Sequence, residues 1–124
     1  MSIKTEEILN FFKDISSIPR CSGKEEKLAK WLQQWADEKG YAHQSDSAGN
    51  LKISVDASPG YEDAPGIVLQ GHMDMVCEKA LDSDHDFTKD PIQLERDGDW
   101  LRARKTTLGA DNGIALALAL ALAS

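Results

Sequence analysis

Hydrophobic positions near the start of the chain recur every three or four residues, which is the spacing of an α-helix. The pattern predicts a helix over Thr5–Ser17, with Thr5 as its N-cap and Pro19 just beyond its end. The apolar residues on its expected buried face are Ile8, Leu9, Phe12 and Ile15.

A second helix is predicted between Ser22 and Gly40. Ser22 and Glu25 have the Ser-x-x-Glu spacing of a capping box, and Gly40 is a typical stop after the last turn. The single apolar face between them consists of Leu28, Trp31, Leu32, Trp35 and Ala36.

Shorter runs predict strands arranged in two hairpins. Tyr41–Ser45 and Leu51–Val55 flank the turn-rich segment Asp46–Asn50. Ile92–Leu94 and Trp100–Arg104 form the second expected pair.

One further strand is expected at Ile67–Leu69, because this short run is rich in β-branched residues, as in a strand covered on both faces. It follows a loop over 56–66 that contains prolines and glycines, and it leads to His72. Open α/β sheets bind ligands at the carboxyl ends of their strands, so this strand is expected to bring His72 to such an edge.

The segment from Gly113 to Ala123 alternates alanine with larger apolar residues. Alternation fits a strand, but alanine is depleted in strands and favoured in helices, so we expect a helix. A helix that is apolar on every side needs burial on every side, and Ser124 is the last residue of the chain. We therefore expect the chain to be the amino-terminal piece of a longer protein. Self-association through this helix is the alternative.

Composition narrows the class of protein. The chain has 124 residues, with 14 basic and 21 acidic side chains and a formal net charge of -7, which fits one α/β domain and disfavours a nucleic-acid surface. The start has no pattern of a secretory signal, and the apolar run over 114–123 is about half of what spans a bilayer. Cys21 and Cys77 have no framework spacing, so free thiols in a cytosolic protein are expected.

The first candidate for chemistry is the pair His72 and Asp74. Residues two apart in an extended strand point to the same side, so the carboxylate could orient the imidazole for metal binding. An isolated His-x-Asp is, however, more often a structural hydrogen-bonded pair.

A second acidic position makes a metal site a stronger alternative to a structural pair. Asp111 lies in a glycine-flanked loop just before the last predicted helix, where it could be an ordinary cap. Together with His72, it gives two loops that each follow a predicted strand and each offer a metal-capable side chain. A metal site and a purely structural role both remain open on the residues alone.

The other polar residues give weaker support for a functional site. The acidic run Asp82–Asp86 fails as a calcium loop, because Phe87 stands where a glycine is needed and Gln93 where a glutamate is needed. His43 and His85 lack partners at useful spacing and are expected to be structural or surface residues. Cys77 has no base beside it, so a buried packing role is expected. The chain contains no motif of serine hydrolases or of nucleotide-binding proteins.

Four blocks of the sequence resemble a known family. They are Ile18–Glu25 (Ile-Pro-Arg-Cys-Ser-Gly-Lys-Glu), Gly71–Val76 (Gly-His-Met-Asp-Met-Val), His85–Ile92 (His-Asp-Phe-Thr-Lys-Asp-Pro-Ile) and Thr107–Ile114 (Thr-Leu-Gly-Ala-Asp-Asn-Gly-Ile). In this order they resemble the amino-terminal part of the aminoacyl-histidine dipeptidases, also called Xaa-His dipeptidases or bacterial carnosinases. These enzymes are dinuclear zinc peptidases, related to aminoacylase and carboxypeptidase G.

The resemblance implies roles for three residues. His72 corresponds to a ligand of one zinc ion, and Asp111 to the carboxylate that bridges two zinc ions. Asp74 corresponds to the carboxylate that holds His72, and we count it with the catalytic residues. The bond between Asp111 and Asn112 is often cis in such enzymes. Two zinc ions per subunit are implied, with Co²⁺ or Mn²⁺ as possible substitutes.

The resemblance also implies a fold and an activity. The fold is part of a three-layer α/β/α catalytic domain, with a mixed sheet flanked by helices. The activity is hydrolysis of dipeptides, in particular of Xaa-His. The parent is expected to be cytoplasmic and homodimeric, with no nucleic-acid or membrane partner. An aminoacylase, a tripeptidase and a metal-free scaffold or interaction module are the alternatives.

The same family uses a general-base glutamate, two further acidic ligands and a closing histidine that all come later than Ser124. The chain alone is therefore expected to be inactive and to bind zinc weakly at most.

Overall fold

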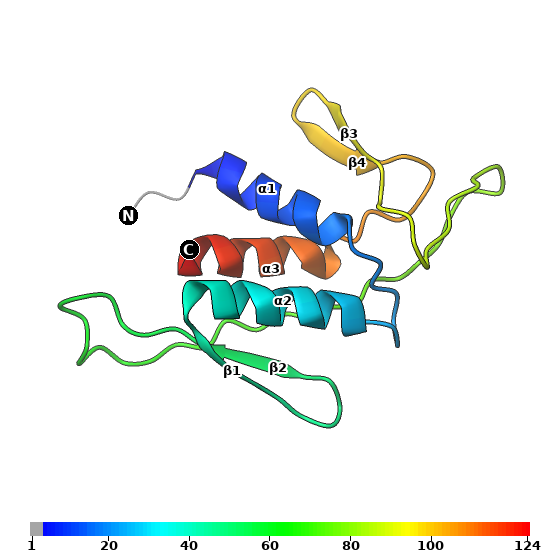
Figure 1. Cartoon of the computed structure of the whole chain (residues 1–124). Helices are drawn as coiled ribbons and strands as arrows, with labels where there is room; N and C mark the ends of the chain where they lie inside the picture. Colours follow the sequence, from blue (N-terminus) through cyan, green and yellow to red (C-terminus); the bar gives the residue numbers. More distant parts are fainter. Residues whose placement is uncertain (1–3) are drawn as a thin grey trace.

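The structure, a computed structural model, describes residues 4–124. The described chain is α/β, as predicted, and its elements follow one another along the sequence as Figure 1 shows. They are α1 (Thr5–Ser16), α2 (Glu26–Lys39), β1 (Ala42–Ser45), β2 (Leu51–Ser54), β3 (Leu94–Asp97), β4 (Trp100–Ala103) and α3 (Ala110–Ala123).

The three helices lie alongside one another (Figure 1) and share one hydrophobic core, which confirms the predicted helical faces. The buried residues of this core come from all three helices and are Phe12, Ile15, Leu28, Leu32, Trp35, Ala36, Ala117 and Leu120. The ring of Trp35 contacts Phe11 and Tyr41 edge-on, with centroids 6.3 and 5.8 Å away. The core thus holds α3, whose first turn carries Asp111, against α1 and α2.

The predicted helix starts need correction. Lys4, not Thr5, is the N-cap of α1, and its backbone N–H donates to the carboxylate of Glu7 at 3.2 Å. The expected capping box of α2 is absent: the helix starts after Glu25, and no side chain caps it. Gly40 ends α2 with φ of 74°, as a left-handed C-terminal glycine should.

The strands form two separate antiparallel hairpins, β1–β2 and β3–β4. In the first, Ala42 pairs with Ser54 and Ser45 with Leu51, which confirms the prediction. In the second hairpin Leu94 pairs with Ala103. β3 therefore begins at Leu94, the last residue of the strand predicted at Ile92–Leu94. The single mixed sheet that the resemblance implied is not present among residues 4–124.

The predicted buried strand at Ile67–Leu69 is wrong for this chain. The segment has no strand structure, and Ile67, Val68 and Leu69 are 83%, 89% and 55% exposed. A strand needs a hydrogen-bonded neighbour, and none of the four described strands pairs with this one. Its β-branched residues are favourable in strands, but a favourable composition does not provide a neighbouring strand to pair with.

The helical prediction for the last segment is confirmed, whereas burial on every side is not. One face of α3 is buried through Gly113, Ala117, Leu120 and Ala121. The other face leaves Ile114, Leu118 and Leu122 exposed. Within residues 4–124 no helix has the length and apolarity needed to cross a membrane.

Candidate metal centre

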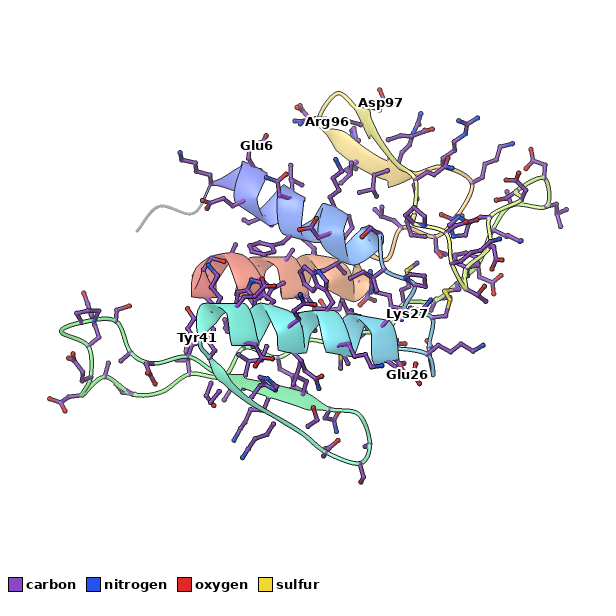
Figure 2. The ribbon with its side chains drawn as sticks, in the orientation of Figure 1. Glu6, Glu26, Lys27, Tyr41, Arg96 and Asp97 are labelled. Carbon is purple, nitrogen blue, oxygen red and sulfur yellow. A yellow bond between two sulfur atoms is a disulfide. The ribbon has the colours of Figure 1, made fainter. Side chains whose placement is uncertain are left out.

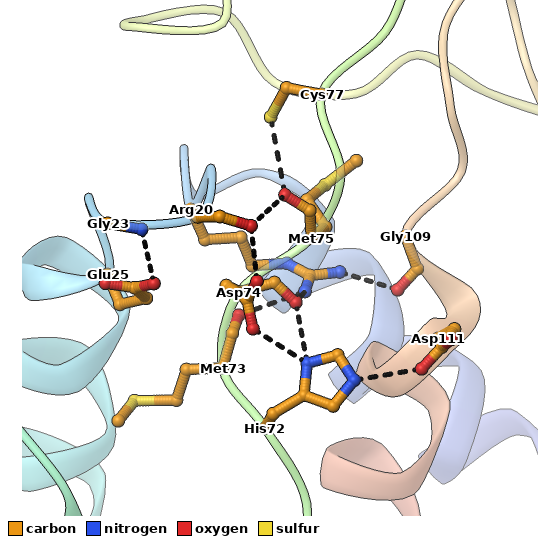
Figure 3. A network of polar contacts seen from close by, with 11 residues as sticks. Arg20, Gly23, Glu25, His72, Met73, Asp74, Met75, Cys77, Gly109 and Asp111 are labelled. Carbon is orange, nitrogen blue, oxygen red and sulfur yellow. Dashed lines mark hydrogen bonds and ion pairs between the residues drawn. The ribbon is translucent and has the colours of Figure 1, made fainter.

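His72 lies in a loop beside its predicted partner. Its Nδ1 atom is 2.9 Å from a carboxylate oxygen of Asp74 and 3.0 Å from the backbone oxygen of the same residue (Figure 3). Both neighbours of Nδ1 are acceptors, so this nitrogen carries the proton. In the neutral imidazole the lone pair is then left on Nε2, which is the arrangement of a histidine ready to bind a metal.

The Nε2 atom faces Asp111. One carboxylate oxygen of Asp111 lies 2.9 Å from it, although the two residues are 39 positions apart in sequence. Asp111 stands in the distorted start of α3, with φ of −92° and ψ of 100°, and the Asp111–Asn112 bond is cis, as predicted. Because its side chain is 93% exposed, the carboxylate is free to bind a ligand from solvent.

The loops that carry these residues approach each other closely. A Cβ atom on Gly71 would lie 3.2 Å from the amide nitrogen of Asn112 and 3.1 Å from a methyl carbon of Leu116. The glycine before His72 therefore allows the first loop to reach the start of α3.

The two carboxylates shape the electrostatics of the imidazole. The hydrogen bond with Asp111, supported by Asp74, raises the pKa of His72. The pKa of Asp74 is lowered, first by a hydrogen bond from Ser22 and then by His72. In the metal-free chain a proton on Nε2 satisfies Asp111, and a cation at this position would compete with that proton.

The donor atoms suit a zinc-type ion. Zinc binds histidine nitrogen and carboxylate oxygen at about 2.0 to 2.2 Å, so two ligands of a tetrahedral ion lie roughly 3.3 to 3.6 Å apart. His72 Nε2 and Asp111 are 2.9 Å apart, which requires only a small separation to admit an ion. Residues 4–124 contain no group of three or more histidine, cysteine or acidic side chains placed to hold a metal. The described chain thus offers two donors of one site.

Ser22 has a role that the sequence did not reveal. Its hydroxyl donates to the second carboxylate oxygen of Asp74, where a capping box had been expected. Glu25, the other half of that box, accepts from the backbone N–H of Gly23 at 2.7 Å (Figure 3). Asp74 is therefore held between a serine and a histidine.

The connection between α1 and α2 runs beside this loop like a short strand. The N–H of Met75 donates to the oxygen of Arg20 at 3.0 Å, and the N–H of Ser22 donates to the oxygen of Met75 at 3.3 Å. Cys21 and Met75 form a parallel bridge. This connection thereby positions Ser22 against Asp74.

Cys21 and Cys77 form a disulfide, with their Cα atoms 5.6 Å apart, so the expectation of free thiols is wrong (Figure 2). Cys77 was expected to be a buried free thiol, and it is instead one half of this disulfide. The parallel bridge between Cys21 and Met75 explains the proximity, because it brings Cys77 near Cys21 across 56 positions of sequence. Spacing along the chain contains no sign of such a contact.

Arg20 is the second functional candidate that the sequence did not reveal. Its side chain is 1% exposed, and it donates to the backbone oxygens of Met73, Asp74 and Gly109 (Figure 3). Burial lowers its pKa, and the nearby Asp74 carboxylate opposes this effect. A polar residue buried in a short connection gives no periodic signal, but its position in the first family-like block was a usable hint.

The remaining histidines lie outside the candidate centre. His43 contacts Asp37 at 2.7 Å, as a structural or surface residue would. His85 is buried and packs edge-on against Phe87, with ring centroids 4.5 Å apart. The acidic run around it makes local hydrogen bonds, such as the one that the hydroxyl of Thr88 donates to Asp86.

No family model matches the chain. Over 120 residues, or 97% of its length, the chain is 48% identical to the cytosol non-specific dipeptidase of Escherichia coli (strain K12), and it covers 25% of that protein. It is 36% identical over 76 residues, or 61% of its length, to a putative [LysW]-lysine/[LysW]-ornithine hydrolase of Pyrococcus abyssi, and covers 21% of it.

The fold has a counterpart among solved structures. The aminoacylhistidine dipeptidase of Vibrio alginolyticus matches 99% of this chain with a TM-score of 0.93 and 49% identity. The chain spans about a quarter of the length of these dipeptidases. The resemblance to aminoacyl-histidine dipeptidases is therefore confirmed over almost the whole of this chain.

Proposed function

We propose that this chain supplies part of the metal centre of a dipeptide-hydrolysing enzyme. The observation that carries the proposal is the placement of His72, whose imidazole is oriented by Asp74 on one side and faces Asp111 on the other. Similarity to two dipeptidases supports the same reaction class.

In this proposal His72 and Asp111 are the ligands, with Nε2 of His72 and the carboxylate of Asp111 directed to the ion. When bound, zinc polarises a carbonyl and lowers the pKa of a water molecule. Asp74 accepts a hydrogen bond from Nδ1–H, which leaves the lone pair of Nε2 for the ion. An exposed carboxylate at Asp111 has a second oxygen for a second ion, which supports the proposed role as a bridge.

The chain does not complete such a centre by itself. With two donors described, further ligands and a general base have to come from other residues, which we place in the remainder of a longer protein. The exposed apolar residues Ile67, Val68, Ile114, Leu118 and Leu122 support this, because they form surface that further structure could bury. We therefore propose that the 124-residue chain alone neither hydrolyses dipeptides nor binds zinc tightly.

For the substrate we propose Xaa-His dipeptides such as β-alanyl-histidine. Support comes from the Vibrio alginolyticus relative, which is named as an aminoacylhistidine dipeptidase. We place the parent in the cytoplasm because the Escherichia coli relative is named as a cytosol protein. A disulfide is at odds with this location, since the cytosol keeps most thiols reduced.

The test is a zinc titration of the full-length protein, with and without Asp111→Ala. Wild type is expected to bind zinc and to lose dipeptide hydrolysis in the presence of a chelator, and the variant is expected to bind far more weakly. A panel of dipeptides, acylated amino acids and tripeptides then separates the substrate classes. Wild-type hydrolysis that resists complete zinc removal would contradict the proposal, and so would β-alanyl-histidine hydrolysis by the 124-residue chain.

A further inference from the structure

We propose that Arg20 is a positioning residue that sets the spacing between His72 and Asp111, and through it the affinity of the centre for a divalent cation. The inference rests on the proposed metal-binding function. Arg20 touches neither ligand side chain directly, so it acts through the backbones that carry them.

The two ends of the guanidinium group bind two different loops. One terminal nitrogen donates to the backbone oxygens of Met73 and Asp74, at 3.1 and 3.3 Å, just after His72. The other donates to the oxygen of Gly109 at 2.7 Å, two residues before Asp111. A single planar guanidinium group thereby connects the loops that carry the two proposed ligands (Figure 3).

Both glycines of the Asp111 loop make room for this side chain. A Cβ on Gly109 would lie 2.5 Å from a terminal nitrogen of Arg20, and one on Gly113 would lie 2.8 Å from it. The loop around Asp111 is therefore shaped against the guanidinium group on both sides. A side chain at either glycine would therefore press against the guanidinium group.

The chemistry of arginine suits this role better than that of lysine. A planar guanidinium holds its donors in a fixed fork, whereas a lysine ammonium is a single point that cannot bind two separated loops in the same way. Among the described residues Arg20 has no ion pair within 4.0 Å, and its Nε atom has no hydrogen-bond partner. Burying a cation costs free energy. In Arg20 this cost is offset by the hydrogen bonds that its two terminal nitrogens donate to the two loops.

The test uses the full-length protein with zinc as the probe. Zinc affinity is measured by competition with a chromophoric chelator for wild type, Arg20→Met, Asp111→Ala and the double variant, each checked for folding by circular dichroism. We expect Arg20→Met to weaken zinc binding by roughly 10- to 100-fold, as for other groups that orient ligands. In the Asp111→Ala background the same change is expected to have less than about a threefold effect, because the positioned ligand is gone.

Arg102→Met is the matched control, since it removes an exposed arginine of β4 and is expected to leave zinc affinity unchanged. Equal zinc affinity of folded Arg20→Met and wild type overturns the inference. An equal loss in both backgrounds overturns it as well, because it indicates general destabilisation. A wild type that binds no zinc overturns the proposed function together with this inference, so the two failures are distinguishable.

A second variant keeps the test decisive if Arg20→Met does not fold. Gly113→Ala retains the arginine but places a methyl group 2.8 Å from its terminal nitrogen and 3.1 Å from the ring of Phe12, so that the guanidinium has to shift and the Phe12 ring is crowded. Weaker zinc binding is expected for this variant, and unchanged binding for Gly66→Ala, whose added methyl group meets no atom within 4 Å. Unchanged zinc affinity in folded Gly113→Ala overturns the inference.

Discussion

The imidazole of His72 and the carboxylate of Asp111 meet across 2.9 Å, although they come from different loops of the chain. In the first loop Asp74 accepts hydrogen bonds from His72 and from Ser22, and in the second Asp111 lies at the start of α3. The contact thus brings two potential metal ligands from separate loops within hydrogen-bond distance of each other.

The orientation of His72 by Asp74 leads to a prediction about zinc affinity. In the full-length protein, Asp74→Asn is expected to weaken zinc binding by roughly 10- to 100-fold, since the amide is a poorer acceptor for the proton on Nδ1. Competition with a chromophoric chelator measures this change. Asp63→Asn, which removes the same charge from an exposed loop, is the control. Equal losses in the two variants would point to net charge as the cause.

The metal-free chain should show a histidine with a raised pKa. The carboxylate of Asp111, with Asp74, favours the protonated form of His72, so its pKa lies above the ordinary value. The contribution of this interaction to the folding stability is fully present below the unfolded-state pKa of His72. It is lost as the pH rises through the folded-state pKa of the same residue. A pH titration of the imidazole signals by NMR checks the direction of the shift.

Asp111→Asn should move that titration back toward the ordinary value, because it removes the largest cause of the shift. Zinc affinity should rise with pH over the same range, since the ion replaces a proton on Nε2. An identical titration in wild type and Asp111→Asn would mean that the contact does not exist in solution.

The disulfide is expected to stabilise the chain. Cys21 and Cys77 are separated by 56 positions, and closing a loop of this size in the unfolded chain is worth about 4 kcal/mol by the chain-entropy model. Cys77→Ser should therefore lower the free energy of unfolding by up to about that amount, as measured by urea denaturation without reductant.

A thiol assay on the unfolded, unreduced protein checks the bond itself and should find no free thiol. If wild type and Cys77→Ser unfold at the same urea concentration, the bond is not formed under the conditions used. The same experiment with reductant measures the stability of the chain without the disulfide.

The helical core provides a prediction that is independent of the metal centre. Leu28 on α2 is fully buried, so Leu28→Ala should cost about 2 to 5 kcal/mol of unfolding free energy. Leu81→Ala removes the same atoms from a fully exposed side chain and should change stability by less than about 0.5 kcal/mol. Chemical denaturation of both variants tests whether this core is formed as described.

The helices were predictable because periodic burial leaves a direct trace in the sequence. Leu28, Leu32 and Ala36 appear on the predicted face of α2 and are buried in the structure. Hairpin β1–β2 was predictable because a turn-rich segment separates two short runs that fit strands. For Ile67–Leu69 the composition indicated a strand, but pairing depends on a neighbour that local sequence does not describe.

The centre was predictable only in part. His72, Asp74 and Asp111 were named from spacing and resemblance, and the structure brings the three side chains together. Arg20 and the disulfide were missed, because their contacts join segments far apart in sequence and follow no period. Ser22 was assigned to a helix cap on its spacing to Glu25, whereas tertiary contact directs its hydroxyl to Asp74.

The most direct measurement is anomalous diffraction at the zinc edge from zinc-loaded crystals of the full-length protein. We expect an anomalous peak within bonding distance of both Nε2 of His72 and the carboxylate of Asp111. Crystals in which both side chains are ordered, zinc is bound elsewhere and no peak lies between them would contradict this expectation.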